Sequence, residues 1–597
     1  MLKYFSKVWY ILKGSRRSLP WLLLLFVISS VLEALGIGLI GPFLSLAQKP
    51  ERINQIPLLD WFYLQLGLHS SSQFVPILGL VIAIVFCTKS VLYFISEQNI
   101  FRFSLRQKGK LISKLLGVYL SVSYVFYLRK NTASMIKNTI VETDNFTWQC
   151  MLPILKAIAN LTVVFVLVLL LARTDLLLFI MIATVLLPTF LLFYQFKKQF
   201  KKWGKEISQS NQEIIRILNH GLGSIKDTRV IGCEYYFHNQ MEQQVKKFAN
   251  AATLAKSFQK LPRIIIETCL ILFLVLFISI YQIFFEQNLQ DLISILAVFA
   301  VAAMRLIPAA SISIQAMGQM QNASYSVDML YLDLKEIEQQ EFTKHLDLEH
   351  SSTIGNNSPS SVNPTLTFTN QVELRNVVYR YPGTSEAALD NISLTIQKGQ
   401  SIAFIGKSGA GKTTLVDVIL GLLEPESGDI LVDDVSIYKD IRSWQNLIGY
   451  IPQSIFLMDE TIERNIAFGV PDHLIDAERM NQAIKAAQLT ELVEQLPNGI
   501  KTSVGERGIR LSGGQRQRIG IARVLYHERE ILVLDEATSA LDNETEKLVS
   551  EAIQSLSGTK TMIIIAHRLT TVEHCDCIYL LEQGRLVKSG TYQEVVG

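Results

Sequence analysis

Six mostly apolar stretches, each long enough to cross a bilayer as a helix, occupy the first half of this 597-residue chain. They cover about 19–46, 75–97, 150–172, 175–196, 264–286 and 291–314. A helix needs about 20 apolar residues to span the hydrocarbon core. Because lipid offers no hydrogen-bond partners to the backbone, these stretches predict a bundle of six membrane-spanning helices.

The chain is too long to fold around one hydrophobic core, which stops growing at about 250–300 residues. Hydrophobic residues make up 49% of the total, but their long runs all precede residue 315. Residues 339–366 are rich in Ser, Asn and Pro, a composition typical of a linker. We therefore expect an all-α membrane domain over 1–338, a linker over 339–366 and a soluble α/β domain over 367–597.

Positive charge is concentrated in two long loops, 98–148 and 197–262. The first contains Arg102, Arg106, Lys108, Lys110, Lys114, Arg129, Lys130 and Lys137, and the second opens with Lys197, Lys198, Lys201, Lys202 and Lys205. The connections on the other side are nearly neutral or acidic, with Arg173 and Asp175 in one and Glu286 and Asp291 in another. Since cytoplasmic loops carry the excess of Lys and Arg, we expect both long loops and both termini in the cytoplasm. Polar, helix-forming residues fill these loops, which predicts that the spanning helices continue into the cytoplasm. No base-stacking pattern accompanies the basic residues, so nucleic-acid binding is not expected.

Several ionisable residues lie inside the apolar runs, where each Arg, Lys or Asp at a helix centre costs about 2.5–3.5 kcal/mol. They are Glu33, Lys89, Glu267 and Arg305, and Arg263 lies at the inner edge of the fifth run. One interpretation places Lys89, Arg263 and Arg305 on the wall of a cavity that attracts an anionic substrate. The other is internal pairing, for example of Arg263 with Glu267 one helical turn away.

A phosphate-binding loop follows the buried-strand run Ser401–Ile405 and precedes an apolar, helix-forming segment. Its residues are Gly406, Lys407, Ser408, Gly409, Ala410, Gly411, Lys412, Thr413 and Thr414. The glycines let backbone N–H groups wrap the phosphates, and the helix N-terminus favours negative charge. Lys412 is expected to reach the β- and γ-phosphates, and the Thr413 hydroxyl to coordinate Mg²⁺.

The apolar strand run Ile531–Glu536 ends in two acids, which complete the expected ATPase chemistry. Asp535 suits the Mg²⁺ shell of a P-loop ATPase. Glu536 is placed to orient or deprotonate the attacking water. Two acids after a strand would by themselves indicate a solvated loop, but the preceding P-loop favours the catalytic interpretation.

The segment Leu511–Gln515 resembles the signature motif of ABC ATPases, and other motifs of that family follow in its order. The signature residues are Ser512, Gly513, Gly514 and Gln515. The resemblance implies that Tyr381 stacks on adenine, that Gln453 touches Mg²⁺ and that His567 holds the γ-phosphate. Ser539–Asp542 resembles the D-loop, and Val504–Gly508 resembles a cytoplasmic contact motif of ABC exporters.

The same resemblance implies an assembly and a mechanism. Two ATPase domains sandwich two ATP molecules between one chain's P-loop and the partner's signature residues, so the chain pairs with a second half-transporter, most simply as a homodimer. Short coupling helices near Tyr127–Asn138 and Ile214–Ser224 are implied as transmitters. ATP and Mg²⁺ are the implied cofactors.

The cargo is indicated by the first apolar run, in which Val31–Phe43 resembles the first helix of PglK-type flippases for lipid-linked oligosaccharides. The intramembrane basic residues and the segment Arg305–Pro308 agree with that subfamily. The outer loop 48–74, which contains Trp61, Phe62 and Tyr63, agrees as well, whether it forms a short helix at the lipid interface or an ordered loop. We therefore predict a flippase or exporter of an anionic glycolipid in the plasma (inner) membrane. Two alternatives stay open: a lipid, peptide or drug exporter of the same architecture, and a non-transporting membrane ATPase that regulates a partner.

Overall fold

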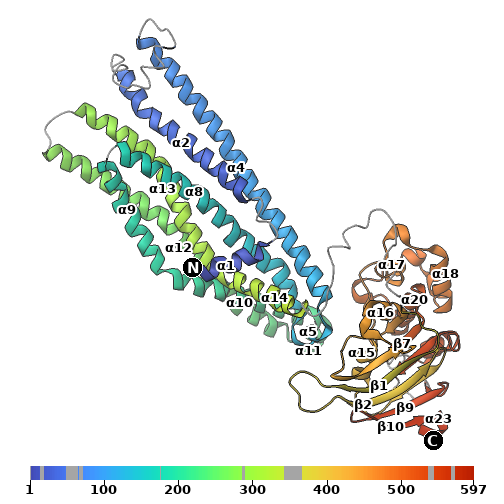
Figure 1. Ribbon diagram of the computed structural model, residues 1–597. Helices are drawn as coiled ribbons and strands as arrows, with labels where there is room; N and C mark the ends of the chain where they lie inside the picture. Colours follow the sequence, from blue (N-terminus) through green and yellow to red (C-terminus); the bar gives the residue numbers. More distant parts are fainter. Residues whose placement is uncertain are drawn as a thin grey trace. The chain divides into compact units, whose positions relative to one another are not determined.

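The computed structural model describes residues 2–13, 19–48, 65, 71–174, 176–284, 289–341, 366–535, 543–565 and 572–596 (Figure 1). The chain divides into two compact units. One consists of Met1–Val122 and Phe126–Asp347, and the other of Ser123–Val125 and Leu348–Gly597. The outer loop 48–74, for which a short helix and an ordered loop were both open, falls largely outside the described residues.

The described part of the first 341 residues is helical throughout. Its elements are α1 (Leu2–Ile11), α2 (Leu19–Gln48), α4 (Ser71–Ser121), α5 (Tyr124–Arg129), α6 (Thr132–Lys137), the π-helical segment η3 (Asn138–Glu142), α7 (Thr143–Phe146), a second π-helical segment η4 (Thr147–Met151), α8 (Leu152–Thr174), α9 (Leu176–Gln195), α10 (Lys197–Gly223), α11 (Ile225–Ile231), α12 (Glu234–Phe284), α13 (Leu289–Asn322) and α14 (Ser324–Glu341). Apart from a few residues at their ends, the six predicted spans fall in α2, α4, α8, α9, α12 and α13.

Two of these helices are far longer than a bilayer is thick. Helices α4 and α12 contain 51 residues each. At 1.5 Å per residue each measures about 75 Å, against a hydrocarbon core of about 30 Å. The prediction that spanning helices continue through the polar loops is therefore confirmed for both. Within the described residues, two helical stretches are long and apolar enough to cross a membrane: Phe74–Ser121 and Thr132–Leu169. Pro20–Gly36 is a shorter apolar helix.

Packing in the first unit pairs α2 with α4 and α8 with α13, while α12 lies along α10 (Figure 1). Away from the apolar spans, a buried core gathers Leu115, Phe126, Phe146, Val327 and Leu330 from four helices. Large apolar side chains on the spans point outward instead. Phe94, Phe165 and Leu80 are more than 60% exposed. Such a continuous apolar exterior is typical of a surface that faces lipid.

The second unit contains two sheets. Its strands are β1 (Gln371–Tyr379), β2 (Leu389–Gln397), β3 (Ser401–Ile405), β4 (Ser427–Val432), β5 (Val435–Ser436), β6 (Ile448–Ile451), β7 (Ile531–Asp535), β8 (Thr561–Ile565), β9 (Cys577–Glu582) and β10 (Arg585–Gly590). An antiparallel sheet has the order β2-β1-β4-β5, and a larger sheet has the order β10-β9-β3-β8-β7-β6. In the larger sheet all pairs except β9–β10 are parallel.

Helices cover the larger sheet, and several of them pack together beside it. They are α15 (Lys412–Ile419), η5 (Ile437–Lys439), α16 (Ile441–Leu447), α17 (Ile462–Ile466), η6 (Asp472–Leu474), α18 (Ala477–Ala486), α19 (Thr490–Gln495), η7 (Gly499–Lys501), η8 (Glu506–Gly508), α20 (Gly513–Tyr526), α21 (Asn543–Gln554) and α23 (Tyr592–Val595). One core joins the two sheets to α15, and another joins the larger sheet to α17, α18 and α20. Strands β3, β7 and β8 are buried almost throughout, as expected for a parallel sheet covered on both faces.

Asp433 fastens the beginning of the second unit. Its carboxylate accepts hydrogen bonds from the backbone N–H groups of Thr369, Asn370 and Gln371 at 2.6–2.9 Å. Despite opposing desolvation, these hydrogen bonds and one from the Thr369 hydroxyl lower the pKa of Asp433 to about 2. The chain that enters from the linker is thereby held against the β4–β5 turn.

Candidate functional site

The phosphate-binding loop lies in the strand–loop–helix arrangement that the sequence predicts. It leaves the carboxyl end of β3, which pairs with β8 and β9, and it enters α15. Gly411 has a φ of 101°, and a Cβ atom there would lie 2.8 Å from the carbonyl oxygen of Ala388. At Gly406 a Cβ atom would lie 2.3 Å from the carbonyl oxygen of Leu581. These two positions require glycine, because any side chain would collide with fixed backbone.

Lys412 folds back into this loop. Its ammonium group donates to the carbonyl oxygens of Gly406 at 2.7 Å and Lys407 at 3.2 Å, and the residue is 6% exposed. The ammonium therefore sits at the concave side of the loop, while Thr413 at the start of α15 remains exposed. A loop that orients a lysine and a helix N-terminus in this way can bind a polyphosphate.

Tyr381 lies beside the first turn of α15. Its hydroxyl is 3.1 Å from the hydroxyl of Thr414, and its ring meets Tyr379 edge-on with centroids 5.1 Å apart. The structure thus places the aromatic residue predicted to stack on adenine next to the phosphate-binding loop.

The carboxyl ends of the parallel strands bring further predicted residues to the same sheet edge. Asp535 ends β7, and Gln453 follows β6 by two residues. The Tyr450 hydroxyl donates to a carboxylate oxygen of Asp535 at 3.2 Å, a contact that sequence reasoning missed. Nearby Asp417 on α15 is half-buried, and burial together with the charge of Asp535 raises its pKa to about 6.

Two predicted catalytic residues, Glu536 and His567, lie outside the described residues, as does the D-loop segment 539–542. Their neighbours are described: β7 ends one residue before Glu536, and β8 ends two residues before His567. Both strands end at the edge that carries the phosphate-binding loop.

The signature residues form the N-terminus of α20. Ser512 caps this helix by accepting a hydrogen bond from the Gln515 N–H at 3.2 Å, and the Gln515 side chain accepts from the Ser512 N–H at 2.8 Å. This reciprocal capping box fixes the first turn, in which Gly513 and Gly514 follow the cap. The helix N-terminus is a suitable place for an anion.

In the membrane helices, three ionisable residues that are far apart in sequence form one cluster. The Lys89 ammonium lies 3.0 Å from a carboxylate oxygen of Glu33, and Arg305 forms an ion pair with the same oxygen. Glu33 is 3% exposed, and the Arg305 guanidinium lies 5.8 Å from the ring centre of Tyr93. The third cation, Arg263, pairs with Glu267 at 2.7 Å on the exposed surface of α12, as the pairing alternative predicts.

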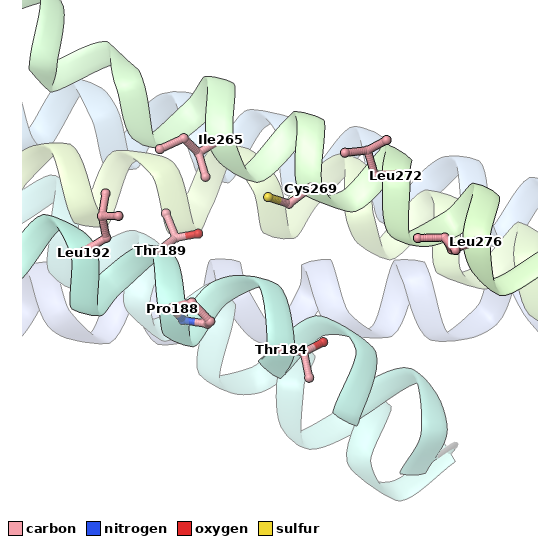
Figure 2. Close-up of a pocket in the computed structure, with 8 residues that line it drawn as sticks. All are labelled: Thr184, Pro188, Thr189, Leu192, Ile265, Cys269, Leu272 and Leu276. Atoms are coloured by element: carbon pink, nitrogen blue, oxygen red, sulfur yellow. The ribbon is translucent and has the colours of Figure 1, made fainter.

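An apolar groove of about 430 Å³ separates part of α9 from part of α12 (Figure 2). Thr184, Pro188, Thr189 and Leu192 line it from α9, and Ile265, Cys269, Leu272 and Leu276 line it from α12. None of these side chains is charged, so the groove offers contacts to hydrocarbon rather than to a head group.

A bundle of spanning helices joined to a P-loop ATPase domain defines an ATP-driven membrane transporter, in the half-transporter form that carries one ATPase domain per chain. The chain belongs to the ABC transporter family and is an ABC exporter half-transporter. The family model described as "ABC transporter" matches residues 389–539.

Relatives and a solved structure extend this similarity beyond the ATPase domain. The chain is 30% identical to the "ATP-dependent lipid A-core flippase" of Ralstonia nicotianae over 489 residues, which cover 81% of this chain and 79% of that protein. The protein of the same name from Cupriavidus metallidurans is 43% identical over 224 residues, which cover 37% and 38% of the two chains. The structure of a bacterial Atm1-family ABC exporter with ATP bound aligns with a TM-score of 0.69 at 22% identity, covering 95% of this chain and 96% of that one.

Proposed function

We propose that this half-transporter flips an anionic lipid-linked oligosaccharide or glycan across the bacterial plasma (inner) membrane, driven by ATP hydrolysis. The cluster of Glu33, Lys89 and Arg305 carries this proposal. One carboxylate and two cations give it a formal charge of +1 among membrane helices. A surplus cation in an apolar bundle favours a substrate with a phosphate or pyrophosphate group.

Two similarities support this class of substrate. Two relatives that match the chain bear the name ATP-dependent lipid A-core flippase, which names lipid A-core as what those proteins flip. The resemblance of Val31–Phe43 to the first helix of PglK-type flippases points to the same chemistry: a lipid tail with a charged, sugar-bearing head. Lys89 and Arg305 are the residues that we assign to the substrate pathway, whereas Arg263 already pairs with Glu267 on the exposed surface of α12.

In the ATP cycle, each chain of a homodimer supplies one half of each site. The loop 406–414 binds the phosphates, Tyr381 stacks on the adenine, and Ser512–Gln515 contact the nucleotide held by the partner. Thr413, Gln453 and Asp535 offer oxygen ligands of the kind that Mg²⁺ prefers. Glu536 activates the attacking water, and His567 contacts the γ-phosphate.

The proposed topology follows from the charges of the loops. Residues 1–338 form the membrane domain, 339–366 the linker and 367–597 the ATPase domain, and both termini lie in the cytoplasm. Basic loops stay on the cytoplasmic side during insertion. A reporter fused to either end is expected to be accessible from the cytoplasm alone.

Reconstitution tests the proposal directly. Purified protein in sealed proteoliposomes is given Mg²⁺ and ATP together with a fluorescent polyprenyl-pyrophosphate oligosaccharide, and movement of the probe between leaflets is measured. We expect ATP-dependent movement that is lost in Glu536→Gln. A glycolipid probe with a phosphate head group, used in parallel vesicles, shows whether the transporter prefers a phosphate or a pyrophosphate.

Two other functions remain as outcomes of this experiment. ATP hydrolysis without movement of either glycolipid, but with movement of another lipid, a peptide or a drug, would assign the chain to another exporter class. ATP hydrolysis without movement of any cargo that is tried would favour a regulatory membrane ATPase. Neither alternative has an observation that favours it over the glycolipid substrate.

A further inference from the structure

The side chain of Asp333, on α14, is a buried hub that collects hydrogen bonds from three other segments. Its carboxylate is 5% exposed. It accepts from the Tyr119 hydroxyl at 2.7 Å, from the Lys130 ammonium at 2.8 Å and from the Asn138 side-chain amide at 2.6 Å. Three short hydrogen bonds, one of them from a cation, satisfy a buried carboxylate that would otherwise be costly.

The three donors flank one short turn of the chain. Tyr119 lies two residues before the end of α4, Lys130 directly follows α5, and Asn138 opens η3. The turn also packs on itself, because the Lys130 ammonium lies 4.6 Å from the ring centre of Phe126. The Tyr127 hydroxyl donates to the carbonyl oxygen of Tyr119. Asp333 therefore holds both flanks of α5 at one point.

A second buried contact fixes the far side of the same turn. The Lys137 ammonium lies 3.0 Å from the Glu142 carboxylate, and these side chains are 1% and 0% exposed. Glu142 also accepts from the Ser208 hydroxyl on α10 at 2.6 Å. The pair spans the π-helical segment η3, where the regular α-helical hydrogen bonding is interrupted. With Asp333, it locks the segment after α5 to two other helices.

Helix α14 is the last described helix before the linker to the ATPase domain. It is also tied to α1, where the Lys7 ammonium lies 2.7 Å from Asp328 and the rings of Tyr10 and Tyr331 meet edge-on. The hub thus connects the helix that continues covalently toward the ATPase domain with the α5 turn, which falls at the first of the predicted coupling segments.

We propose that Asp333 is a positioning residue that couples ATP hydrolysis to transport, because its carboxylate makes the α5 turn and α14 move as one body. The proposal rests on the transport function proposed above. Replacing the carboxylate by an amide removes the negative charge that accepts these hydrogen bonds and presents N–H groups to donors. The two flanks of α5 then lose their common anchor, while the nucleotide-binding residues are untouched.

The test compares Asp333→Asn with Asp328→Asn in the full-length protein in proteoliposomes. Asp328 is a matched control because it lies on the same helix and also pairs with a lysine, but that lysine is Lys7 of α1, which lies outside α5 and its flanks. For Asp333→Asn we expect basal ATP hydrolysis near the wild-type rate and about tenfold less cargo moved per ATP, the scale of one lost charged hydrogen bond. Asp328→Asn is expected to keep the wild-type ratio.

A second experiment needs no cargo, so its result does not depend on which substrate the protein transports. Hydrogen exchange is compared between nucleotide-free and vanadate-trapped protein. In the wild type and in Asp328→Asn we expect trapping to change the exchange of peptides from both 123–137 and 324–335. In Asp333→Asn we expect trapping no longer to change the exchange of the two peptides together. We also expect 123–137 to exchange faster than in the wild type in both states.

Two results would overturn the proposal: a wild-type ratio of transport to hydrolysis in Asp333→Asn, or linked exchange responses in that variant. An equal loss of both activities would show a purely structural role.

If Asp333→Asn does not fold, Tyr119→Phe and Lys130→Met each remove one donor and keep the carboxylate buried. Both are expected to lower the ratio, and wild-type ratios in both would contradict the proposal. If the wild type hydrolyses ATP but moves no glycolipid, only the cargo assignment fails, and the exchange arm still decides the role of Asp333.

Discussion

Glu33 on α2 and Lys89 on α4 form a buried ion pair, with 3.0 Å between the carboxylate and the ammonium and side chains that are 3% and 11% exposed. Arg305 of α13 joins the same carboxylate, so one acid connects three helices of the membrane domain. A buried charge that loses its partner is strongly destabilising, because nothing compensates its desolvation.

Glu33→Gln is therefore expected to destabilise the protein by roughly 3–5 kcal/mol, since it leaves two cations without a carboxylate. Thermal unfolding of the detergent-solubilised protein measures the effect. Glu267→Gln is the matched control, because it breaks a pair whose members lie on the exposed surface of α12 and it is expected to change the midpoint little. Equal shifts in both variants would show that Glu33 is not the anchor that its contacts indicate.

Arg305→Ala changes the charge of the cluster from +1 to 0, since Glu33 and Lys89 remain. We expect basal ATP hydrolysis to persist and transport of the anionic glycolipid to fall, as measured in the flipping assay. Arg305→Lys keeps the charge but loses the planar fork of donors, so a partial recovery is expected. Unchanged transport in the alanine variant would leave Arg305 with a structural role only.

Lys412→Ala is expected to abolish ATP hydrolysis, because the ammonium that the loop orients is lost and the phosphates lose a positive charge. Lys398→Ala serves as the control: Lys398 lies before β3, at the other end of that strand, and pairs with Glu530. Steady-state ATPase measurements decide the matter. Wild-type turnover in Lys412→Ala would remove this loop from the nucleotide site.

The raised pKa of Asp417 predicts that the stability of the protein depends on pH. Its folded-state pKa is about 6, above its ordinary value of 3.8, so the folded protein holds a proton that the unfolded chain has released. Stability therefore falls as pH rises between these two values and stays at the lower level above about pH 6. Asp417→Asn removes this cost.

The measurement for Asp417 is thermal unfolding of the full-length protein without Mg²⁺ at pH 5 and pH 8. The variant is expected to gain stability over the wild type at pH 8 and about half as much at pH 5, because pH 5 lies between the two pKa values. Because Asp417 is only half-buried, solvent screening reduces the gain. A difference that is the same at both pH values would show that Asp417 does not titrate in this range.

Much of the ATPase site follows from local sequence. The strand Ser401–Ile405, the loop and the helix after it occur where the residues predict them, and the strand Ile531–Asp535 ends at the predicted acid. These motifs are readable because glycine conformations, an apolar strand and a helix start depend on neighbours within a few positions. Tyr450 was not predicted, since its contact with Asp535 spans 85 residues and exists only through the pairing of β6 with β7.

The short helices of the two long basic loops were harder to place. The second coupling segment was predicted near Ile214–Ser224, which falls in the last turns of α10, and a separate short helix, α11 (Ile225–Ile231), follows it. Helix α11 ends at Gly232, which has a φ of 72°. A helix end of this kind depends on a single cap, so the polar pattern around it left the boundary open by several residues.

The sequence by itself determined that six apolar helices precede a P-loop ATPase domain, because length, hydropathy and glycine spacing act within one element. Only the tertiary structure decided which charges meet. Glu33 reaches Lys89 across 56 residues, and Asp333 gathers Tyr119, Lys130 and Asn138 across 195–214 residues. Such contacts depend on how each helix is rotated and shifted against its neighbours, which no local pattern encodes.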